Sequence, residues 1–224
     1  MKGVLFDYAG TLFMTEPARV LVGRAAPGRL SDAEVDALAA AYERAGLPGG
    51  EYPEAIPPEL AHAYAIRDLG PEENERAYVG LLRAAGEPWD GFARDVYRQI
   101  LEPATWVPYA DAVSVIGELL AGGIAVGVVS NIAFDVRPIL RAHGLGALTD
   151  RCALSFEVGA AKPDARIFRA ALELLGSPAH ETLMVGDLEE ADGAAARVGM
   201  PTLILPITPP GSVHGLAEVL RRIR

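Results

Sequence analysis

The chain has 224 residues, enough for one large domain or for one domain that carries an insertion. Half of the residues are hydrophobic, so a sizeable core can form, and the single cysteine excludes an intrachain disulfide. A net charge of −10 argues against nucleic-acid or anionic-membrane surfaces, because both need basic patches. The N-terminus lacks a signal-peptide pattern and no apolar run is long enough to span a bilayer, which predicts a cytoplasmic protein.

A buried strand over residues 3–6 opens the chain, and Asp7 follows it directly. From residue 15 to 102 we then predict helices and no strand. The first of these helices begins at a capping box formed by Ser31 and Glu34. The remaining predicted elements of this stretch are helices over 59–69, 71–85 and 90–101, with a Pro- and Gly-rich connection at 48–53.

The second half of the chain alternates short apolar runs with helical patterns. Buried strands are predicted over 124–129, 152–155, 182–185 and 202–205. Helices are predicted over 111–120, 164–175, 192–198 and 213–223. Because the apolarity of the strands is continuous, both faces of the sheet must be covered. We therefore expect an α/β fold, a doubly wound parallel sheet, with an all-helical insertion placed after the first strand as a lid.

Polar side chains follow three of the predicted strands. Asp7 ends the first, Ser130 and Asn131 end the second, and Asp187 ends the fourth. In a doubly wound sheet these strand ends converge at one edge. Carboxylates beside hydroxyl and amide groups suit a hard divalent cation, which would stabilise charge on a phosphoryl group and leave one carboxylate free to attack.

Lysine usage supports this interpretation. Lys2 and Lys162 are the only lysines, against eighteen arginines. A chain that prefers arginine but keeps a lysine just before a predicted helix suggests that a compact point charge is needed there.

Four segments occur in the order of a known set of motifs. The chain resembles the haloacid dehalogenase-like superfamily, in the branch with a helical cap after the first motif, through Asp7-Tyr8-Ala9-Gly10-Thr11, Ser130-Asn131, Lys162-Pro163 and Gly186-Asp187 through Asp192. The resemblance implies a Rossmann-like core of residues 1–14 and 103–224 and a helical cap of residues 15–102.

The resemblance also implies roles by position. Asp7 would be the nucleophile that forms an aspartyl-phosphate, and Thr11, Ser130 and Lys162 would hold the transferring group. Gly10 and Asn131 would also contact the substrate. Mg²⁺ would be bound by Asp7, the backbone carbonyl of Ala9 and Asp187, with Asp192 supporting the metal.

Position 9 departs from the family pattern. Family phosphatases carry a second aspartate there, which protonates the leaving oxygen and then activates water, whereas this chain has Ala9. General acid–base catalysis contributes roughly 10²–10⁴-fold, so simple alkyl phosphates should react slowly unless another group substitutes. Glu16, Glu54 and His62 are candidates in the insertion for that role.

Three functions remain open. The first is a Mg²⁺-dependent phosphohydrolase acting on a small phosphorylated molecule, as a monomer or homodimer, without nucleic-acid or membrane partners. The alternative is a non-catalytic protein of the same fold that binds a phosphorylated ligand or partner. A dehalogenase or phosphonatase-type hydrolase is the least favoured. The phosphonatase group needs a lysine in the insertion to form a Schiff base, and this insertion has none. The dehalogenases need no metal, whereas this chain keeps the carboxylate of Asp187 as a metal ligand.

Overall fold

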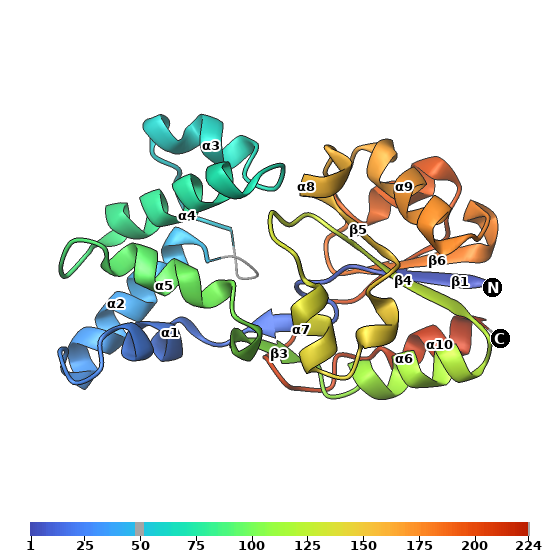
Figure 1. Cartoon of the computed structure of the whole chain (residues 1–224), viewed down its shortest axis with the longest axis horizontal. Coiled ribbons are helices and arrows are strands. Elements are labelled where there is room, and N and C mark those ends of the chain that lie inside the picture. The colour runs from blue at the N-terminus through green and yellow to red at the C-terminus, as the bar shows by residue number, and fades with distance from the viewer. Residues whose placement is uncertain (48–51, 224) are drawn as a thin grey trace.

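The computed structural model describes residues 1–47 and 52–223, with an α/β core at one end and a group of helices at the other (Figure 1). A five-stranded sheet in the core has the order β5-β4-β1-β6-β7, and every neighbouring pair runs parallel. The expected doubly wound parallel sheet is confirmed. Its strands are β1 (Gly3–Phe6), β4 (Ala125–Ser130), β5 (Cys152–Leu154), β6 (Thr182–Gly186) and β7 (Thr202–Ile204).

Helices cover both faces of this sheet. In β1 successive side chains point to opposite faces, so Val4 and Phe6 join one hydrophobic cluster while Leu5 joins another. The first cluster includes residues of α6, which packs beside α10, and the second includes residues of α9 (Figure 1). The core helices are α6 (Ala112–Ala121), α7 (Arg137–Ala142), α8 (Ser155–Val158), α9 (Ala165–Leu175) and α10 (Ala217–Ile223).

After β1 the chain forms a set of helices, α1 to α5; together with the segments that connect them to one another and to the core, we call them the helical insertion. Its helices are α1 (Ala18–Ala25), α2 (Asp32–Ala45), α3 (Ala61–Ala65), α4 (Pro71–Ala85) and α5 (Phe92–Ile100). They pack against one another around the fully buried side chains of Tyr42, Leu82 and Phe92. The predicted capping box is confirmed, because Ser31 Oγ accepts from the Glu34 N–H and the Glu34 carboxylate accepts from the Ser31 N–H at 2.7 Å.

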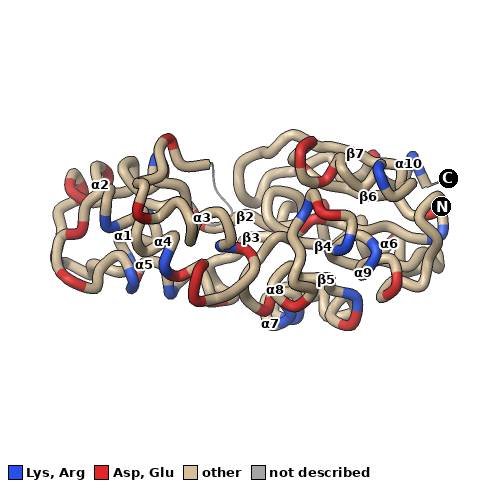
Figure 2. Tube along the Cα trace, turned by 90° about the horizontal axis from the view of Figure 1, so that it is seen from above, with Lys and Arg blue, Asp and Glu red and all other residues tan. Residues whose placement is uncertain are grey.

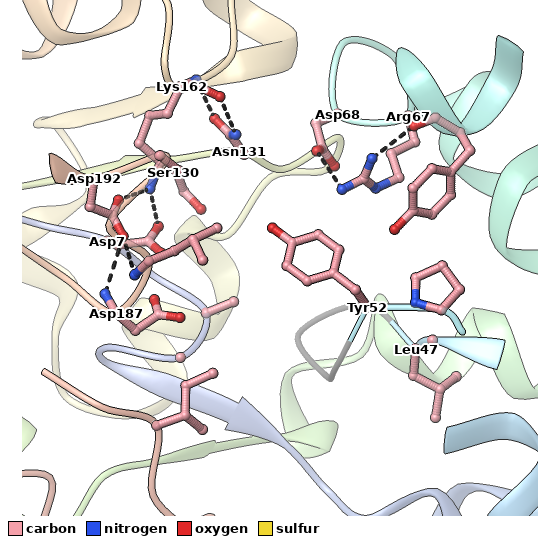
Figure 3. A pocket seen from close by; sticks show the side chains of 18 of the residues that line it. Asp7, Leu47, Tyr52, Arg67, Asp68, Ser130, Asn131, Lys162, Asp187 and Asp192 are labelled. Atoms are coloured by element: carbon pink, nitrogen blue, oxygen red, sulfur yellow. Dashed lines mark hydrogen bonds and ion pairs between the residues drawn. The ribbon is translucent and has the colours of Figure 1, made fainter. Parts of the chain in front are cut away.

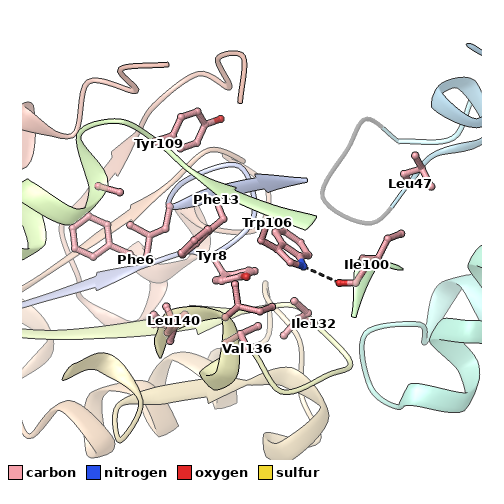
Figure 4. Packing of buried hydrophobic residues seen from close by; sticks show 14 of the residues in the cluster. Phe6, Tyr8, Phe13, Leu47, Ile100, Trp106, Tyr109, Ile132, Val136 and Leu140 are labelled. Atoms are coloured by element: carbon pink, nitrogen blue, oxygen red, sulfur yellow. Dashed lines mark hydrogen bonds between the residues drawn. The ribbon is translucent and has the colours of Figure 1, made fainter. Parts of the chain in front are cut away.

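A two-stranded antiparallel sheet joins the core to the helical insertion. It consists of β2 (Phe13–Thr15) and β3 (Trp106–Pro108), so the expectation of no strand from residue 15 onward was wrong at its first residue. Tyr8 packs its ring between those of Phe13 and Trp106, with centroids 5.0 and 4.9 Å away. The Trp106 indole donates a hydrogen bond to the Ile100 carbonyl at 2.8 Å (Figure 4). The joint is therefore a packed aromatic cluster.

Several other elements differ from the expected ones. The helix predicted over 59–69 is a 3₁₀ turn followed by α3, which ends at Ala65. The segment predicted over 192–198 is a 3₁₀ helix (Gly193–Val198), and the last helix begins at Ala217. Ser155, expected at the end of a strand, opens α8. The sequence did not indicate α1 or α7, and the connection predicted over 48–53 lies for the most part outside the described residues.

Charged residues of both signs are distributed over the core and the helical insertion. Along the trace, basic positions are interspersed with acidic ones (Figure 2), and many form surface ion pairs such as Arg94 with Glu75. Within residues 1–47 and 52–223, no helix has both the length and the apolarity needed to cross a membrane.

Candidate active site

The central strands of the sheet end at one edge, and each end carries a polar residue. The Asp7 N–H donates to the Val185 carbonyl at 2.8 Å, which extends the pairing of β1 and β6 by one residue and fixes the start of the Asp7 loop. Ser130 is the last residue of β4, the strand on the other side of β1. Asp187 follows β6 directly. The expected convergence of strand ends is therefore seen for all three side chains.

The turn after Asp7 is shaped to approach Asp187. Gly10 has a φ of +85°, which is accessible to glycine at little cost, and a Cβ on Gly10 would lie only 2.7 Å from the Asp187 carboxyl group. The next residue, Thr11, donates from Oγ1 to Asp187 Oδ1 at 3.2 Å. Gly10 thus lets the loop come close, and Thr11 holds the carboxylate in place.

Lys162 is buried between two carboxylates. Its Nζ lies 2.7 Å from Asp7 Oδ1 and 2.6 Å from Asp192 Oδ1, and its side chain is only 2% exposed (Figure 3). Asp192 Oδ2 accepts from the N–H groups of Asp187 and Leu188 at 3.1 and 3.0 Å. Asp192 therefore orients both the lysine and the loop that carries Asp187.

Asn131 holds the backbone of Lys162. Its Nδ2 donates to the Lys162 carbonyl at 2.9 Å, and its Oδ1 accepts from the Lys162 N–H at 2.6 Å. The end of β4 is in this way tied to the loop that presents the lysine. A substrate contact by Asn131 stays a prediction.

Negative charge exceeds positive charge at this site. Burial is the main cause that raises the pKa of Asp7 to about 8, with further increases from Asp192 and Asp187, while Lys162 opposes them. Burial and Asp192 likewise raise the pKa of Asp187. Burial alone would lower the pKa of Lys162, but the carboxylates of Asp192 and Asp7 outweigh it and raise that pKa above its usual range. One ammonium group therefore faces three carboxyl groups.

The donor set fits a divalent cation. Asp7, Asp187 and Asp192 each offer one carboxylate oxygen, and these oxygens lie within 4.8 Å of one another. Oxygen ligands of this kind suit Mg²⁺, whose charge would balance the excess of carboxylates. Ala9, whose carbonyl was predicted as a further ligand, lines the same cavity.

A cavity of about 390 Å³ opens in front of these groups. Its core side contains Ala9, Gly10, Ser130 and Asn131 among the residues predicted for the site, whereas Thr11 is fully buried and does not line the cavity. Figure 3 shows the opposite wall across from Ser130 and Asn131. That opposite wall comes from the helical insertion and was not predicted. It includes Leu47, Tyr52, Tyr64, Arg67, Asp68 and Tyr78. The one feature of the sequence that could have indicated this wall is the charged pair Arg67-Asp68, which interrupts an apolar stretch after Tyr64.

The residues of the insertion that the sequence did suggest lie elsewhere. Neither Glu16, Glu54 nor His62 lines this cavity. Glu16 forms an ion pair with Arg24 at 2.6 Å. None of the three is therefore placed to replace the aspartate missing at position 9.

The protein is an α/β protein whose candidate site lies at the carboxyl edge of a parallel sheet. An aspartate, a lysine and two further carboxylates lie together at this edge. Within that class, the chain belongs to the haloacid dehalogenase-like hydrolases, because the model of that family matches residues 1–199.

Individual relatives are similar over part of their length. A haloacid dehalogenase-like hydrolase domain-containing protein 3 from Danio rerio is 36% identical over 98 residues, 44% of this chain and 40% of that protein. A phosphoserine phosphatase from Thermus thermophilus is 31% identical over 131 residues, 49% of this chain and 53% of that protein. A pyrimidine 5′-nucleotidase from Escherichia coli is 37% identical over 87 residues, 38% of each chain. The chain thus spans about half or less of these curated relatives.

Solved structures share the fold over nearly the whole chain. A dehalogenase with an intermediate complex has a TM-score of 0.70 at 21% identity, covering 100% of this chain and 97% of that one. A HAD-hydrolase from Bacillus subtilis bound to magnesium has a TM-score of 0.68 at 20% identity, covering 99% and 98%.

Proposed function

We propose that the chain is a Mg²⁺-dependent phosphohydrolase that works through a covalent aspartyl-phosphate on Asp7. One observation carries the proposal: Asp7, Asp187 and Asp192 surround a single buried lysine with an excess of negative charge that a divalent cation would balance. The names of two relatives, a phosphoserine phosphatase and a pyrimidine 5′-nucleotidase, support phosphoryl chemistry.

Each predicted site residue has a place in this proposal. Catalysis is assigned to Asp7, Thr11, Ser130 and Lys162, and substrate contacts to Gly10, Ser130, Asn131 and Lys162. The metal ligands are Asp7, the Ala9 carbonyl and Asp187, with Asp192 in support. The division into a core of 1–14 and 103–224 and a cap of 15–102 is part of the same proposal.

The reaction proceeds in two displacements. The Asp7 carboxylate attacks phosphorus, the bond to the leaving oxygen breaks, and water then cleaves the aspartyl-phosphate to release inorganic phosphate. Lys162 lowers the pKa of Asp7 and so opposes the effect of burial. The Ser130 hydroxyl donates to a phosphoryl oxygen, whereas the Thr11 hydroxyl, which donates to Asp187 Oδ1, holds that carboxylate in place. When bound, Mg²⁺ supplies further positive charge to the phosphoryl oxygens.

The test is pre-steady-state hydrolysis of p-nitrophenyl phosphate by the wild type and Asp7→Asn in the presence of Mg²⁺. We expect the wild type to release p-nitrophenolate and to form an acid-stable phosphoenzyme, and Asp7→Asn to do neither. Asp90→Asn, a fully exposed aspartate of the insertion, is the matched control and should behave as the wild type. No release by the wild type, with Mg²⁺ still binding, favours the alternative of a protein that binds a phosphorylated ligand without turnover.

Ala9 favours a second candidate function. A halide ion leaves without a proton, so a carbon–halogen hydrolase that uses Asp7 as nucleophile has no need of an acid at position 9. Halide release from a 2-halo acid in the presence of a chelator would support this candidate over phosphoryl transfer. Asp187 argues against it, because a metal carboxylate has no role in that reaction.

A further inference from the structure

Among the described residues on the core side of the cavity, no side chain is free to move the proton that phosphate-ester hydrolysis requires. Ala9 carries only a methyl group, and Asp7, Asp187 and Asp192 are engaged with Lys162, with Thr11 or with the backbone. Among the described residues that line the cavity, one further carboxyl group remains, that of Asp68. It comes from the opposite wall, in the segment between α3 and α4.

Asp68 faces the strand ends across the cavity. Figure 3 shows its carboxyl group on the wall opposite Asp7 and Lys162, next to Arg67. Its side chain is 18% exposed, and the Arg67 guanidinium lies 3.6 Å away. Lys162 is close enough for its charge to act on Asp68. A substrate whose phosphoryl group lies at Asp7 would therefore place its leaving oxygen between the two walls.

Asp68 is also tied to the core. Its backbone carbonyl accepts a hydrogen bond from the hydroxyl of Ser155, the first residue of α8. The same hydroxyl accepts from the Ile132 N–H at 2.8 Å, two residues beyond Ser130. This link fixes the Asp68 segment relative to the end of β4, so the position of the carboxyl group does not depend on the insertion alone.

We propose that Asp68 is the general acid and base of the reaction, taking the place of the aspartate that position 9 lacks. The inference rests on the proposed phosphohydrolase function and names a catalytic residue for it.

The proton balance is as follows. In the first step Asp7 forms a bond to phosphorus while the bond to the leaving oxygen breaks, and neutral Asp68 gives its proton to that oxygen. In the second step the Asp68 carboxylate takes a proton from the water that attacks phosphorus. Inorganic phosphate leaves, and both Asp7 and the protonated Asp68 are regenerated.

The surroundings of Asp68 favour a carboxyl group that can hold a proton. Burial raises its pKa, although Arg67 and Lys162 act in the opposite direction. The charged or titratable groups that interact with Asp68 are Arg67, Lys162, Tyr52, Tyr64 and Tyr78. Because the first step needs the neutral form, its rate should fall as the pH rises through the Asp68 pKa.

The decisive variant is Asp68→Asn, which keeps the shape of the side chain but cannot carry the proton. With p-nitrophenyl phosphate, whose leaving group needs no acid, the first turnover should stay close to that of the wild type. The second phase should slow by about 10²–10⁴-fold, so that a burst of one equivalent precedes it. Across ring-substituted phenyl phosphates, the first-step rate of Asp68→Asn should fall more steeply with leaving-group basicity than the wild-type rate does. The decrease of this rate at high pH, expected for the wild type, should be absent in Asp68→Asn.

The controls separate a proton-transfer role from a structural one. Asp68→Glu should recover part of the second-phase rate, and Asp90→Asn should match the wild type. An equal loss for every leaving group, or no loss at all, would overturn the assignment of Asp68 while phosphoenzyme formation on Asp7 still held. Absence of a phosphoenzyme in the wild type, or turnover that survives Asp7→Asn, would overturn the phosphohydrolase function and this inference with it.

Discussion

The two lysines of the chain offer a matched pair for testing how buried charge is balanced at the site. Lys162 is 2% exposed and contacts Asp7 and Asp192, whereas Lys2 is 71% exposed and contacts Glu181 at 2.8 Å. Replacing Lys162 by Met leaves two buried carboxyl groups without their cation. Removing one partner of a buried ion pair destabilises a protein by about 3–5 kcal/mol. For a chain of this size, that predicts a fall in melting temperature of about 6–20 °C.

The assay is thermal unfolding in buffer with chelator, followed by circular dichroism, so that no divalent cation can take the place of the lysine. Lys2→Met should melt close to the wild type, because solvent screens its exposed ion pair. Asp7, whose pKa is already about 8, can take up a proton in Lys162→Met and so relieve part of the destabilisation. Below that pH, the fall in melting temperature should therefore lie near the lower end of the predicted range. Equal melting temperatures for the two variants would refute the view that the lysine balances buried carboxylates.

Three further predictions concern the same site. Gly10→Ala should weaken Mg²⁺ binding by about 10–100-fold in calorimetry, because the new Cβ displaces Asp187. Gly28→Ala is the control: its φ of +67° imposes a similar backbone strain, but its Cβ points into open space, so Mg²⁺ binding should not change. Mg²⁺ at a hundred times its dissociation constant should raise the free energy of unfolding by about 2.7 kcal/mol, and chelation should abolish both this gain and turnover; a melting temperature indifferent to Mg²⁺ would count against the metal site. Finally, burial raises the pKa of folded Asp68 above its ordinary 3.8, so the folded state binds that proton more tightly than the unfolded chain. The contribution of this proton to the stability of the wild type is fully present below pH 3.8 and is lost as the pH rises through the folded pKa. Asp68→Asn has no such proton, so in thermal melts its stability relative to the wild type should increase from acid to neutral pH.

The core of the fold was readable from sequence because its signals are local. Parallel strands buried on both faces appear as continuous apolar runs, and the polar residues that end them, such as Asp7 and Asp187, must meet at one edge once the strands are parallel. The first strand, Gly3–Phe6, was predicted with the bounds that it has in the structure. The convergence of Asp7, Ser130 and Asp187 follows from that topology, whereas Lys162, which lies in a loop before α9, was suggested by lysine usage and by the resemblance.

The elements that the sequence did not reveal depend on partners far away in the chain. β2 and β3 have three residues each, too few to show a periodic pattern, and Pro108 lowers the strand propensity of β3. α7 has six residues and α1 has eight, so each is too short to show an extended apolar stripe.

Asp68 and Ser155 show the same limit at the site itself. They lie 87 positions apart, and their hydrogen bond exists only once the helical insertion lies against the core. Read from sequence alone, Ser155 continues the apolar run of β5, and Asp68 is one acidic residue among many in the insertion. What sets Asp68 apart is the wall of the cavity on which it lies, and that is decided by tertiary packing.

The pairing of β2 with β3 has a consequence for how the molecule folds. It brings Thr15 beside Trp106, so that residues 16–105 form one closed loop whose two ends leave the core at the same point. The entropy lost in closing a flexible loop grows only with the logarithm of its length, by about 0.6 kcal/mol for each doubling. Once the two short strands pair, a long insertion therefore costs the core only slightly more loop-closure entropy than a short one. Chains that share this joint can exchange or enlarge the segment above the site with little effect on the stability of the sheet beneath it.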